Sequence, residues 1–562
     1  MKIALAQLNY HIGNFELNTK KIIETIHAAK AKKVDLVVFA ELAVCGYPAR
    51  DFLEFTEFIE LCDKAVVAIA AECKGIAAIV GCPSVNPKIE GKNLFNSAYF
   101  LEKGRVKAKV HKTLLPTYDV FDEYRYFEPN TQFELVELMG KKIALTICED
   151  LWNVDEDPLY VKAPMDELIH LRPDLMINIA ASPFDYRHRE DRLEVLSNNC
   201  EKYNLPLIYV NHIGAQTELV FDGGSMVMNA NGHLIDELKY FEEDFSIVEF
   251  NSGLCAFEAK EVSIGGAWQN EDNDKPLDVS GLETIERIYN ALVLGIRDYF
   301  QKSGFSKATL GMSGGIDSAV VLALAAEALG KDNVLPVLMP SQYSTNHSVD
   351  DSMDMINLIG CKHETIAIKD IFDSFQTALK PQFKDLPFNL TEENMQARIR
   401  GVLLMAISNK FGYILLNTSN KSENAVGYGT LYGDMCGGLS VIGDVYKTQV
   451  FALARYINRN GIIIPENIIT KEPSAELRPD QKDSDSLPEY EALDKVLYQY
   501  VELRKSSREI IAQGVDEVLV KRILKLVNTN EYKRHQTPPI LRVSPKAFGI
   551  GRRMPIVGKY LS

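Results

Sequence analysis

Ser313-Gly314-Gly315-Ile316-Asp317-Ser318 is the stretch that decides the fold. It follows a short apolar run at 308–312 and opens a helical pattern at 319–326, which predicts strand, small-residue loop and helix. Glycines let the backbone approach an anion closely, and the N-terminus of the following helix favours negative charge there. An aspartate inside a phosphate-binding loop calls for a cation beside it, so Asp317 also indicates Mg²⁺. The Walker pattern of a P-loop is absent from this segment.

Two series of alternating strand and helix patterns divide the chain. Such alternation predicts two α/β domains, which we place at 1–260 and 283–562 with a polar, turn-rich linker at 261–282. In the first series, strands are expected at 2–8, 34–39, 76–80, 142–147, 175–179 and 207–210, with helices at 17–30 and 189–203. In the second series, a helix at 283–300 precedes strands at 308–312, 334–339, 363–368 and 413–417.

Composition restricts the function classes. The 562 residues carry a net charge of −16, which argues against a broad nucleic-acid-binding surface. The nine cysteines form no CxxC pair and do not cluster with histidine, so we expect neither a zinc site nor a disulfide framework. No apolar run approaches the roughly 18 residues of a membrane-spanning helix, and the N-terminal run is too short for a signal peptide. Together these features predict a cytoplasmic protein with reduced thiols that does not contact a membrane.

Three residues of the first series could carry amide chemistry. Glu41 and Cys148 each follow an apolar strand, where α/β folds place their active sites, and Lys112 lies in the polar segment between them. A thiolate can attack a carbonyl carbon, a carboxylate can take and return the proton, and an ammonium can stabilise the oxyanion. Taken singly, a cysteine is more often a small buried hydrophobe, and a lone Glu or Lys is more often solvated.

The segments around these three residues resemble the nitrilase superfamily, whose triad is Glu, Lys and Cys, over about residues 1–250. The resemblance implies an αββα sandwich in this half of the chain. It also implies that Glu41 is the general base, Lys112 the oxyanion stabiliser and Cys148 the nucleophile. Glu123 matches the family's auxiliary glutamate, with a solvated surface acid as the alternative.

The glutaminase branch of that superfamily binds glutamine at positions that match Tyr118, Ser182 and a basic residue soon after Ser182. The branch has Gly-Lys where this chain has Arg187-His188. We therefore assign the contact to His188, with the neighbouring Arg187 and Arg189 as alternatives.

The second series carries several further polar motifs. Thr418-Ser419-Asn420-Lys421-Ser422-Glu423 follows the predicted strand at 413–417, a position that suits a nucleotide and a metal ion. Arg398 and Arg400 lie two positions apart on a predicted helix and therefore point to different faces. A polar segment with three prolines at 471–489 is expected to be a mobile loop that helps to close the site. The remaining motifs are Tyr432-Gly433-Asp434, Lys447-Thr448-Gln449-Val450, Pro473–Pro479 and basic islands at 532–536 and 547–553.

The SGGIDS loop resembles the pyrophosphate loop of ATP pyrophosphatases, and the motifs in this order resemble NAD synthetases over about residues 283–555. The resemblance implies a Rossmann-like, doubly wound parallel sheet in this half. With the nitrilase-like half in front, the whole chain resembles the family of glutamine-dependent NAD⁺ synthetases. Those ligases hydrolyse L-glutamine and use the ammonia to amidate deamido-NAD⁺ through an adenylate, converting ATP to AMP and pyrophosphate. The family also implies a homo-oligomer.

Residue roles follow from the same resemblance. Asp317 and Glu423 are expected to bind Mg²⁺, while Asn394, Glu423 and Lys533 contact deamido-NAD⁺, with Arg398 a weaker candidate. The family has a Gly where this chain has Ser419, which alters that loop slightly. The residues expected to bind ATP are Gly311, Met312, Ser313, Gly314, Gly315, Ile316, Asp317, Ser318 and Thr418.

Other readings remain open on the sequence. One is a nitrilase-type amidase whose second half only senses nucleotide, and another is a pyrophosphate-loop amidotransferase with a different carboxylate substrate. A tRNA thiolase needs a cysteine pair and a basic RNA-binding surface, and this acidic chain has neither. A non-catalytic nucleotide-binding scaffold would tolerate replacement of Cys148 and Asp317.

Overall fold

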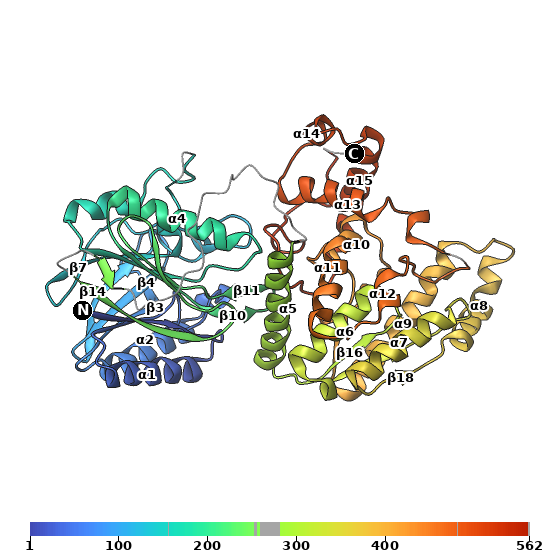
Figure 1. The fold of residues 1–562 in the computed structure, drawn as a ribbon, viewed down its shortest axis with the longest axis horizontal. Helices are drawn as coiled ribbons and strands as arrows, with labels where there is room; N and C mark the ends of the chain where they lie inside the picture. The colour runs from blue at the N-terminus through green and yellow to red at the C-terminus, as the bar shows by residue number, and fades with distance from the viewer. Residues whose placement is uncertain (155–156, 252–255, 259–280, 480, 560–562) are drawn as a thin grey trace. The chain divides into compact units, whose positions relative to one another are not determined.

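The computed structural model describes residues 1–154, 157–251, 256–258, 281–479 and 481–559. They belong to two compact units, Met1–Lys275 and Pro276–Ser562 (Figure 1). The linker predicted at 261–282 lies outside the described residues, except for its last two positions. Within the described part of the chain, no helix is both long and apolar enough to cross a membrane.

Two sheets stacked between helices form the first unit (Figure 1). The seven-stranded sheet has the order β15-β14-β1-β2-β3-β4-β5, and the six-stranded sheet has the order β13-β12-β9-β8-β7-β6. The first sheet comprises β1 (Lys2–Gln7), β2 (Leu36–Val38), β3 (Ala77–Val85), β4 (Leu94–Glu102), β5 (Arg105–His111), β14 (Asp244–Asn251) and β15 (Ala256–Glu258). The second comprises β6 (Val136–Leu138), β7 (Lys141–Ile147), β8 (Leu175–Ala180), β9 (Leu207–Asn211), β12 (Met226–Met228) and β13 (Leu234–Glu237), and β10 (Ile213–Gln216) pairs separately with β11 (Leu219–Asp222).

Strand β1 shows why the first sheet is apolar on both faces. Ile3 and Leu5 pack in the core between the two sheets, whereas Ala4 and Ala6 pack with the helices on the outer face. Successive side chains of a strand point to opposite faces, so a strand covered on both sides reads as a continuous apolar run. The helices that cover the sandwich are α1 (Phe15–Ala31) and α2 (Thr56–Glu72) on the first sheet and α4 (His188–Tyr203) on the second, with the short α3 (Pro164–Leu168) beside β7. The expected αββα sandwich is therefore confirmed.

All six strands predicted in this half are present, with ends shifted by at most five residues. The two predicted helices correspond to α1 and α4. Sequence reasoning missed β4, β5, β6 and the strands after β9. Strand β5 has an exposed face and alternates polar with apolar residues, so it lacks the continuous apolar run that revealed the buried strands.

Five parallel strands form the sheet of the second unit, in the order β18-β17-β16-β19-β20. They are β16 (Ala308–Gly311), β17 (Val334–Leu338), β18 (Glu364–Thr365), β19 (Ile414–Asn417) and β20 (Leu439–Ser440), of which only β20 was not predicted. On one face lie α5 (Leu282–Ser303), α6 (Ile316–Leu329), α7 (Asn346–Ile359) and α11 (Lys447–Ile457), and on the other α8 (Lys369–Phe383) and α9 (Leu390–Phe411). The expected doubly wound sheet is therefore also confirmed.

A helical layer completes this unit. Its core is shared by α10 (Lys421–Val426), α13 (Tyr490–Leu497) and α15 (Glu517–Thr529). Helices α14 (Ser507–Ala512) and α16 (Glu531–Arg534) pack against α15, whereas α12 (Glu466–Thr470) contacts α6 and α11. Strands β16 and β19 are neighbours, but the chain continues from β16 toward β17 and from β19 toward β20, in opposite directions along the sheet. Their carboxyl ends therefore open a crevice at the point where the strand order reverses, the usual ligand position in such sheets.

We predict that Gly81→Ala destabilises the first unit. Gly81 lies in β3, where an added Cβ would sit 2.3 Å from the Leu42 nitrogen and 2.5 Å from the Ala40 oxygen. Such overpacking against rigid backbone is expected to lower the free energy of unfolding by about 3 kcal/mol, measured by urea denaturation.

Gly140→Ala provides the control. Its φ is +75° but an added Cβ meets nothing within 4 Å, so only the backbone cost of roughly 1 kcal/mol is expected. A loss at Gly81 no larger than the loss at Gly140 would contradict the packing argument.

Candidate active sites

Three strand ends of the first unit bring Glu41, Lys112 and Cys148 into one buried site. Lys112 and Cys148 directly follow β5 and β7, and Glu41 lies three residues beyond β2. Strands β2 and β5 belong to the first sheet and β7 to the second, so the site lies where both sheets end. Cys148 has a φ of +44°, in the left-handed region, and begins a short 3₁₀ turn, Cys148–Leu151. This sharp strand-to-turn transition presents the thiol at the end of the strand.

Lys112 lies between two carboxylates. Its Nζ is 2.8 Å from Glu41 Oε1 and 2.8 Å from Glu123 Oε1, and all three side chains are buried. Asn96 of β4 donates through Nδ2 to Glu41 Oε1 at 2.6 Å and to Glu123 Oε2 at 3.4 Å. Tyr47 donates its hydroxyl to Glu123 Oε1 at 3.0 Å. The charges of this site are therefore paired and held by neutral donors as well.

The electrostatics of the site set the starting protonation states. Burial raises the pKa of the Cys148 thiol well above its usual range, Glu41 raises it further, and Lys112 opposes the shift. Burial raises the pKa of Glu123 to about 7, with Lys112 lowering it and Glu41 raising it. Burial lowers the pKa of Lys112, but Glu123 and Glu41 outweigh burial and raise it overall. Cys148 therefore begins as a thiol beside a charged ammonium, and its proton must leave during any nucleophilic step.

The residues expected to bind glutamine lie against the turn that carries Cys148. Tyr118 donates its hydroxyl to Glu149 Oε1 at 2.8 Å, directly beside the nucleophile. Ser182 Oγ and His188 Nε2 are 2.6 Å apart, and the His188 ring stacks on Trp152 with ring centroids 5.0 Å apart.

Arg189, one of the alternatives to His188, is ion-paired with Glu237 of β13 at 3.0 Å. The structure thus brings His188, rather than Arg189, to Ser182.

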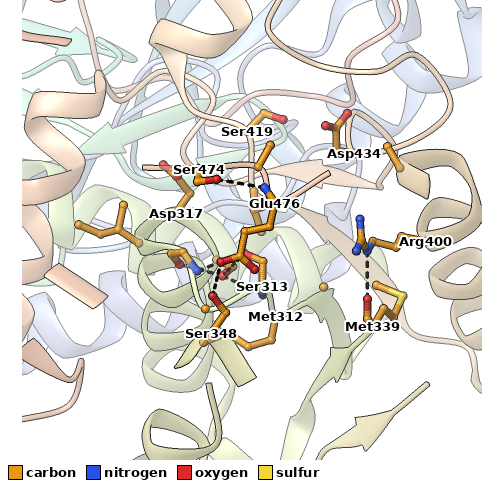
Figure 2. Close-up of a pocket in the computed structure, with 18 of the residues that line it drawn as sticks. Met312, Ser313, Asp317, Met339, Ser348, Arg400, Ser419, Asp434, Ser474 and Glu476 are labelled. Atoms are coloured by element: carbon orange, nitrogen blue, oxygen red, sulfur yellow. Dashed lines mark hydrogen bonds between the residues drawn. The ribbon is translucent and has the colours of Figure 1, made fainter. Parts of the chain in front are cut away.

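A cavity of about 290 Å³ opens at the carboxyl ends of β16 and β19 (Figure 2). All eight predicted loop residues from Gly311 to Ser318 line it, as does Thr418. Gly314 has a φ of +78°, and an added Cβ would sit 2.4 Å from the Ser348 carbonyl oxygen. The loop is closed by Ser313 Oγ, which accepts from the Gly315 N–H at 3.2 Å, and by Ser318 Oγ, which donates to the Gly315 carbonyl at 2.9 Å.

The two predicted metal ligands, Asp317 and Glu423, both line this cavity, and both lie beside the ammonium of Lys447. The ammonium of Lys447 donates to Asp317 Oδ2 and lies 3.6 Å from Glu423 Oε1. Asn420 donates through Nδ2 to Asp317 Oδ1 at 2.9 Å. Burial and the neighbouring Asp317 raise the pKa of Glu423 to about 8, although Lys447 lowers it. Two ionised carboxylates would carry more negative charge than one ammonium offsets, so Glu423 holds its proton at neutral pH.

Two predicted deamido-NAD⁺ contacts do not line this cavity. Asn394 and Lys533 are not among the described residues that line the cavity. Asn394 Oδ1 accepts from the Thr430 hydroxyl at 2.7 Å, and Lys533 Nζ donates to the Gly427 and Gly429 carbonyls at 2.7 and 2.8 Å. Both therefore hold the segment 427–430.

The two arginines of α9 differ as their spacing predicts. Arg398 is exposed and donates to the Leu431 carbonyl at 3.2 Å. Arg400 lines the cavity and donates to the Met339 carbonyl at 3.1 Å (Figure 2). Burial lowers the pKa of Arg400 to about 10, although the nearby Asp434 and Glu476 act to raise it. Arg400 thus places a positive charge in the cavity, whereas Arg398 does not line it.

Part of the predicted mobile loop crosses the cavity. Residues 471–477 and Asp483 line it. Glu476 accepts from the Ser348 hydroxyl at 2.6 Å (Figure 2). It has a φ of +48° and also accepts from the Thr345 hydroxyl at 3.1 Å. Gln396 Nε2 donates to the Leu477 carbonyl at 2.8 Å. The segment is therefore held to α7 and α9 at this edge.

Comparisons with known proteins match both units. Residues 2–257 match the carbon-nitrogen hydrolase family, and residues 288–537 match the NAD synthase family. The chain is 45% identical to the glutamine-dependent NAD(+) synthetase of a Synechocystis species over 99% of this chain and 98% of the relative. The chain belongs to the glutamine-dependent NAD⁺ synthetases. It is also 42% identical to the Acinetobacter baylyi member, again over 99% of this chain and 98% of that protein.

A solved member of the family has the same fold. The glutamine-dependent NAD⁺ synthetase of Acinetobacter baumannii, solved in complex with ADP, is 39% identical, with a TM-score of 0.76. The match covers 99% of this chain and 98% of that one.

Sequence reasoning missed several residues of this synthetase's sites. Asn96 and Tyr47 hold the carboxylates of the first site, and Ser348 lines the second and donates to Glu476. Arg400 and Lys447, which also line the second site, were named in the sequence without a role there. Asn96 is a polar residue within the mostly apolar strand β4, a signal that is visible only once β4 is recognised as a strand.

We predict that Gly314→Ala weakens nucleotide binding. The added Cβ meets the Ser348 carbonyl and must displace the loop from the anion position. Affinity for ADP, measured by calorimetry, is expected to fall at least about tenfold, the equivalent of 1.4 kcal/mol.

Gly304→Ala is the matched control, because Gly304 has a φ of +76° but an added Cβ there meets nothing within 4 Å. Equal affinity losses in the two variants would show that the clash is irrelevant.

Proposed function

We propose that this chain makes NAD⁺ from deamido-NAD⁺, ATP and L-glutamine. Glutamine is hydrolysed to glutamate and ammonia in the first unit, and the ammonia amidates deamido-NAD⁺ in the second. The observation that carries the proposal is the coexistence, in one member of this family, of a buried Glu-Lys-Cys group and a small-residue loop at a sheet switch point.

The first reaction needs a nucleophile, a base and an oxyanion stabiliser. Cys148 Sγ attacks the side-chain amide carbon of glutamine while its proton passes to Glu41. Lys112 stabilises the oxyanion, and Glu41 returns the proton to the leaving ammonia. Water then attacks the thioester, Glu41 takes its proton, and glutamate leaves as the thiol is restored. The raised pKa of Cys148 supports this order, because the base must act in the same step as the attack.

Binding of glutamine is assigned to Tyr118, Ser182 and His188, which lie around the Cys148 turn. Glu123 is assigned as the auxiliary glutamate. It shares Lys112 with Glu41, so it keeps the ammonium charged and oriented.

The second reaction joins a carboxylate and ammonia. The nicotinate carboxylate of deamido-NAD⁺ attacks the α-phosphorus of ATP and pyrophosphate leaves. Ammonia then attacks the acyl carbon of the adenylate and AMP leaves. The residues from Gly311 to Ser318, with Thr418, are assigned to ATP, and Asn394, Glu423 and Lys533 to deamido-NAD⁺. Residues 471–489 are assigned a closing role that excludes water from the adenylate, because part of this segment already crosses the cavity.

Mg²⁺ is assigned to Asp317 and Glu423. Their carboxylate oxygens are the hard donors that this ion prefers. A divalent cation between them would offset the repulsion from Asp317 that helps to raise the pKa of Glu423. When bound, Mg²⁺ would stabilise the charge that develops on the departing pyrophosphate.

Assembly and location are further parts of the proposal. We expect a homo-oligomer, to be tested by sedimentation velocity, with domains at 1–260 and 283–562. A cytoplasmic location is supported by the eight described cysteines, all of which are free thiols.

Cys148→Ala tests the division of labour. Wild type is expected to form NAD⁺ from deamido-NAD⁺, ATP and Mg²⁺ with either glutamine or ammonium as donor. The variant should lose glutamine-driven synthesis by at least about 10³-fold, because the nucleophile is gone, and keep ammonium-driven synthesis. Absence of NAD⁺ formation by wild type from either donor would overturn the synthetase assignment.

Lys447→Met tests the charge balance of the second site. Without the ammonium, Asp317 and Glu423 face each other, so the free energy of unfolding should fall by about 3–5 kcal/mol. A carboxyl whose folded-state pKa is raised loses stability as pH rises from its unfolded value of about 4.3. The stability deficit of the variant should therefore grow as pH rises through about 8, the pKa of Glu423 in the unmodified protein. Unfolding is followed from the unfolded-state pKa of about 4.3 to pH values above the folded-state pKa.

The same variant tests the metal assignment. Mg²⁺ between the two carboxylates should restore part of the lost stability, whereas Lys447→Arg, which keeps the charge, should gain little from the ion. Stability of Lys447→Met that is unaffected by Mg²⁺ would contradict the assignment.

A further inference from the structure

Asp150 is a buried carboxylate that the proposed reaction does not use. Its Oδ1 accepts the backbone N–H groups of Thr113 and Leu114, each at 2.9 Å. Its Oδ2 accepts the Ile147 N–H at 3.0 Å. The side chain is 3% exposed, so both oxygens are committed to backbone donors in the interior.

These donors flank the residues assigned to chemistry. Thr113 directly follows Lys112, and Ile147 directly precedes Cys148. The two segments leave strands of different sheets, β5 of the first and β7 of the second. One carboxylate therefore links the ends of the two strands that carry the ammonium and the thiol.

No strand pairing between β5 and β7 connects these two strand ends in the described part of the chain. The segment at 113–114 lies beyond the end of β5, and β6 pairs with β7 only through Lys141–Ile143. Buried N–H groups need acceptors, and an ionised carboxylate is a strong one. Burial raises the pKa of Asp150 to about 6, while the Leu114 and Ile147 N–H groups and Lys112 lower it, so the group is ionised at neutral pH.

We propose that Asp150 is a positioning residue for the proposed glutaminase reaction, fixing the Cys148 turn relative to Lys112. The inference rests on that proposed function. It goes beyond the assigned triad, because Asp150 touches neither substrate nor the reacting atoms. Its effect is to hold the thiol and the ammonium at the spacing that attack and oxyanion stabilisation need.

Asp150→Asn separates the two ends of the link. The amide oxygen can still accept from Thr113 and Leu114, but the amide N–H₂ then faces the Ile147 N–H, donor against donor. The Cys148 turn is released while the Lys112 segment stays held. The kcat of glutamine-driven synthesis should fall about 10- to 100-fold, and the KM for glutamine should change less, because Ser182 and His188 keep their mutual hydrogen bond. The rate at which iodoacetamide alkylates Cys148 should fall in parallel with kcat.

Asp174→Asn is the matched control. Asp174 Oδ2 also accepts a backbone N–H, that of Lys142 at 2.8 Å, but at the opposite end of β7 from Cys148. Its glutamine-driven kcat should equal that of wild type. Ammonium-driven synthesis should be unchanged in both variants, since the second unit is not altered.

Asp150→Glu serves as a second variant, in case Asp150→Asn does not fold by circular dichroism. It keeps the charge but displaces the carboxylate by one methylene, so kcat should again fall in a folded protein. A folded Asp150 variant with wild-type kcat, or an equal fall in Asp174→Asn, would overturn the positioning role. Wild type without glutamine-driven synthesis would instead overturn the proposed function itself.

Discussion

An ammonium held between two buried carboxylates is the constraint on which the first site depends. Lys112 contacts Glu41 and Glu123 at 2.8 Å each, out of reach of solvent. Burying charges costs several kcal/mol per ion unless each is paired and hydrogen-bonded, so this group persists only where every partner is supplied. The supply comes from strand ends of both sheets, because Asn96 lies in β4 and the Ala181 N–H, which donates to Glu41 Oε2 at 2.9 Å, follows β8. The two stacked sheets therefore supply the groups that keep these charges paired.

The second unit uses the same electrostatic arrangement in a different setting. Lys447 lies between Asp317 and Glu423, and all three residues line the cavity. Both sites therefore set two carboxylates against one ammonium, and in each site one carboxyl, Glu123 or Glu423, has a raised pKa. The difference lies in what the charged groups face, which is neighbouring side-chain and backbone donors in the first site and a cavity in the second.

Residue patterns predicted the strands that are buried on both faces, since these read as continuous apolar runs. They also predicted Glu41, Lys112 and Cys148 as separate candidates and the phosphate loop as a unit. They did not predict β5, which has one exposed face, or Asn96, whose significance appears only when β4 is aligned beside Lys112. Nor could spacing show that Asn394 and Lys533 hold the segment 427–430, because that depends on tertiary packing between distant elements.

The protonation state of Cys148 is the central claim of this account, and the S–H stretching band in the infrared reports it directly. The measurement is a difference spectrum between wild type and Cys148→Ala at neutral pH, without glutamine. Because burial and Glu41 raise the pKa of the thiol, we predict an S–H band that is present in wild type and absent from the variant. No difference in this band, which would mean that Cys148 is already a thiolate, would contradict proton transfer to Glu41 during attack.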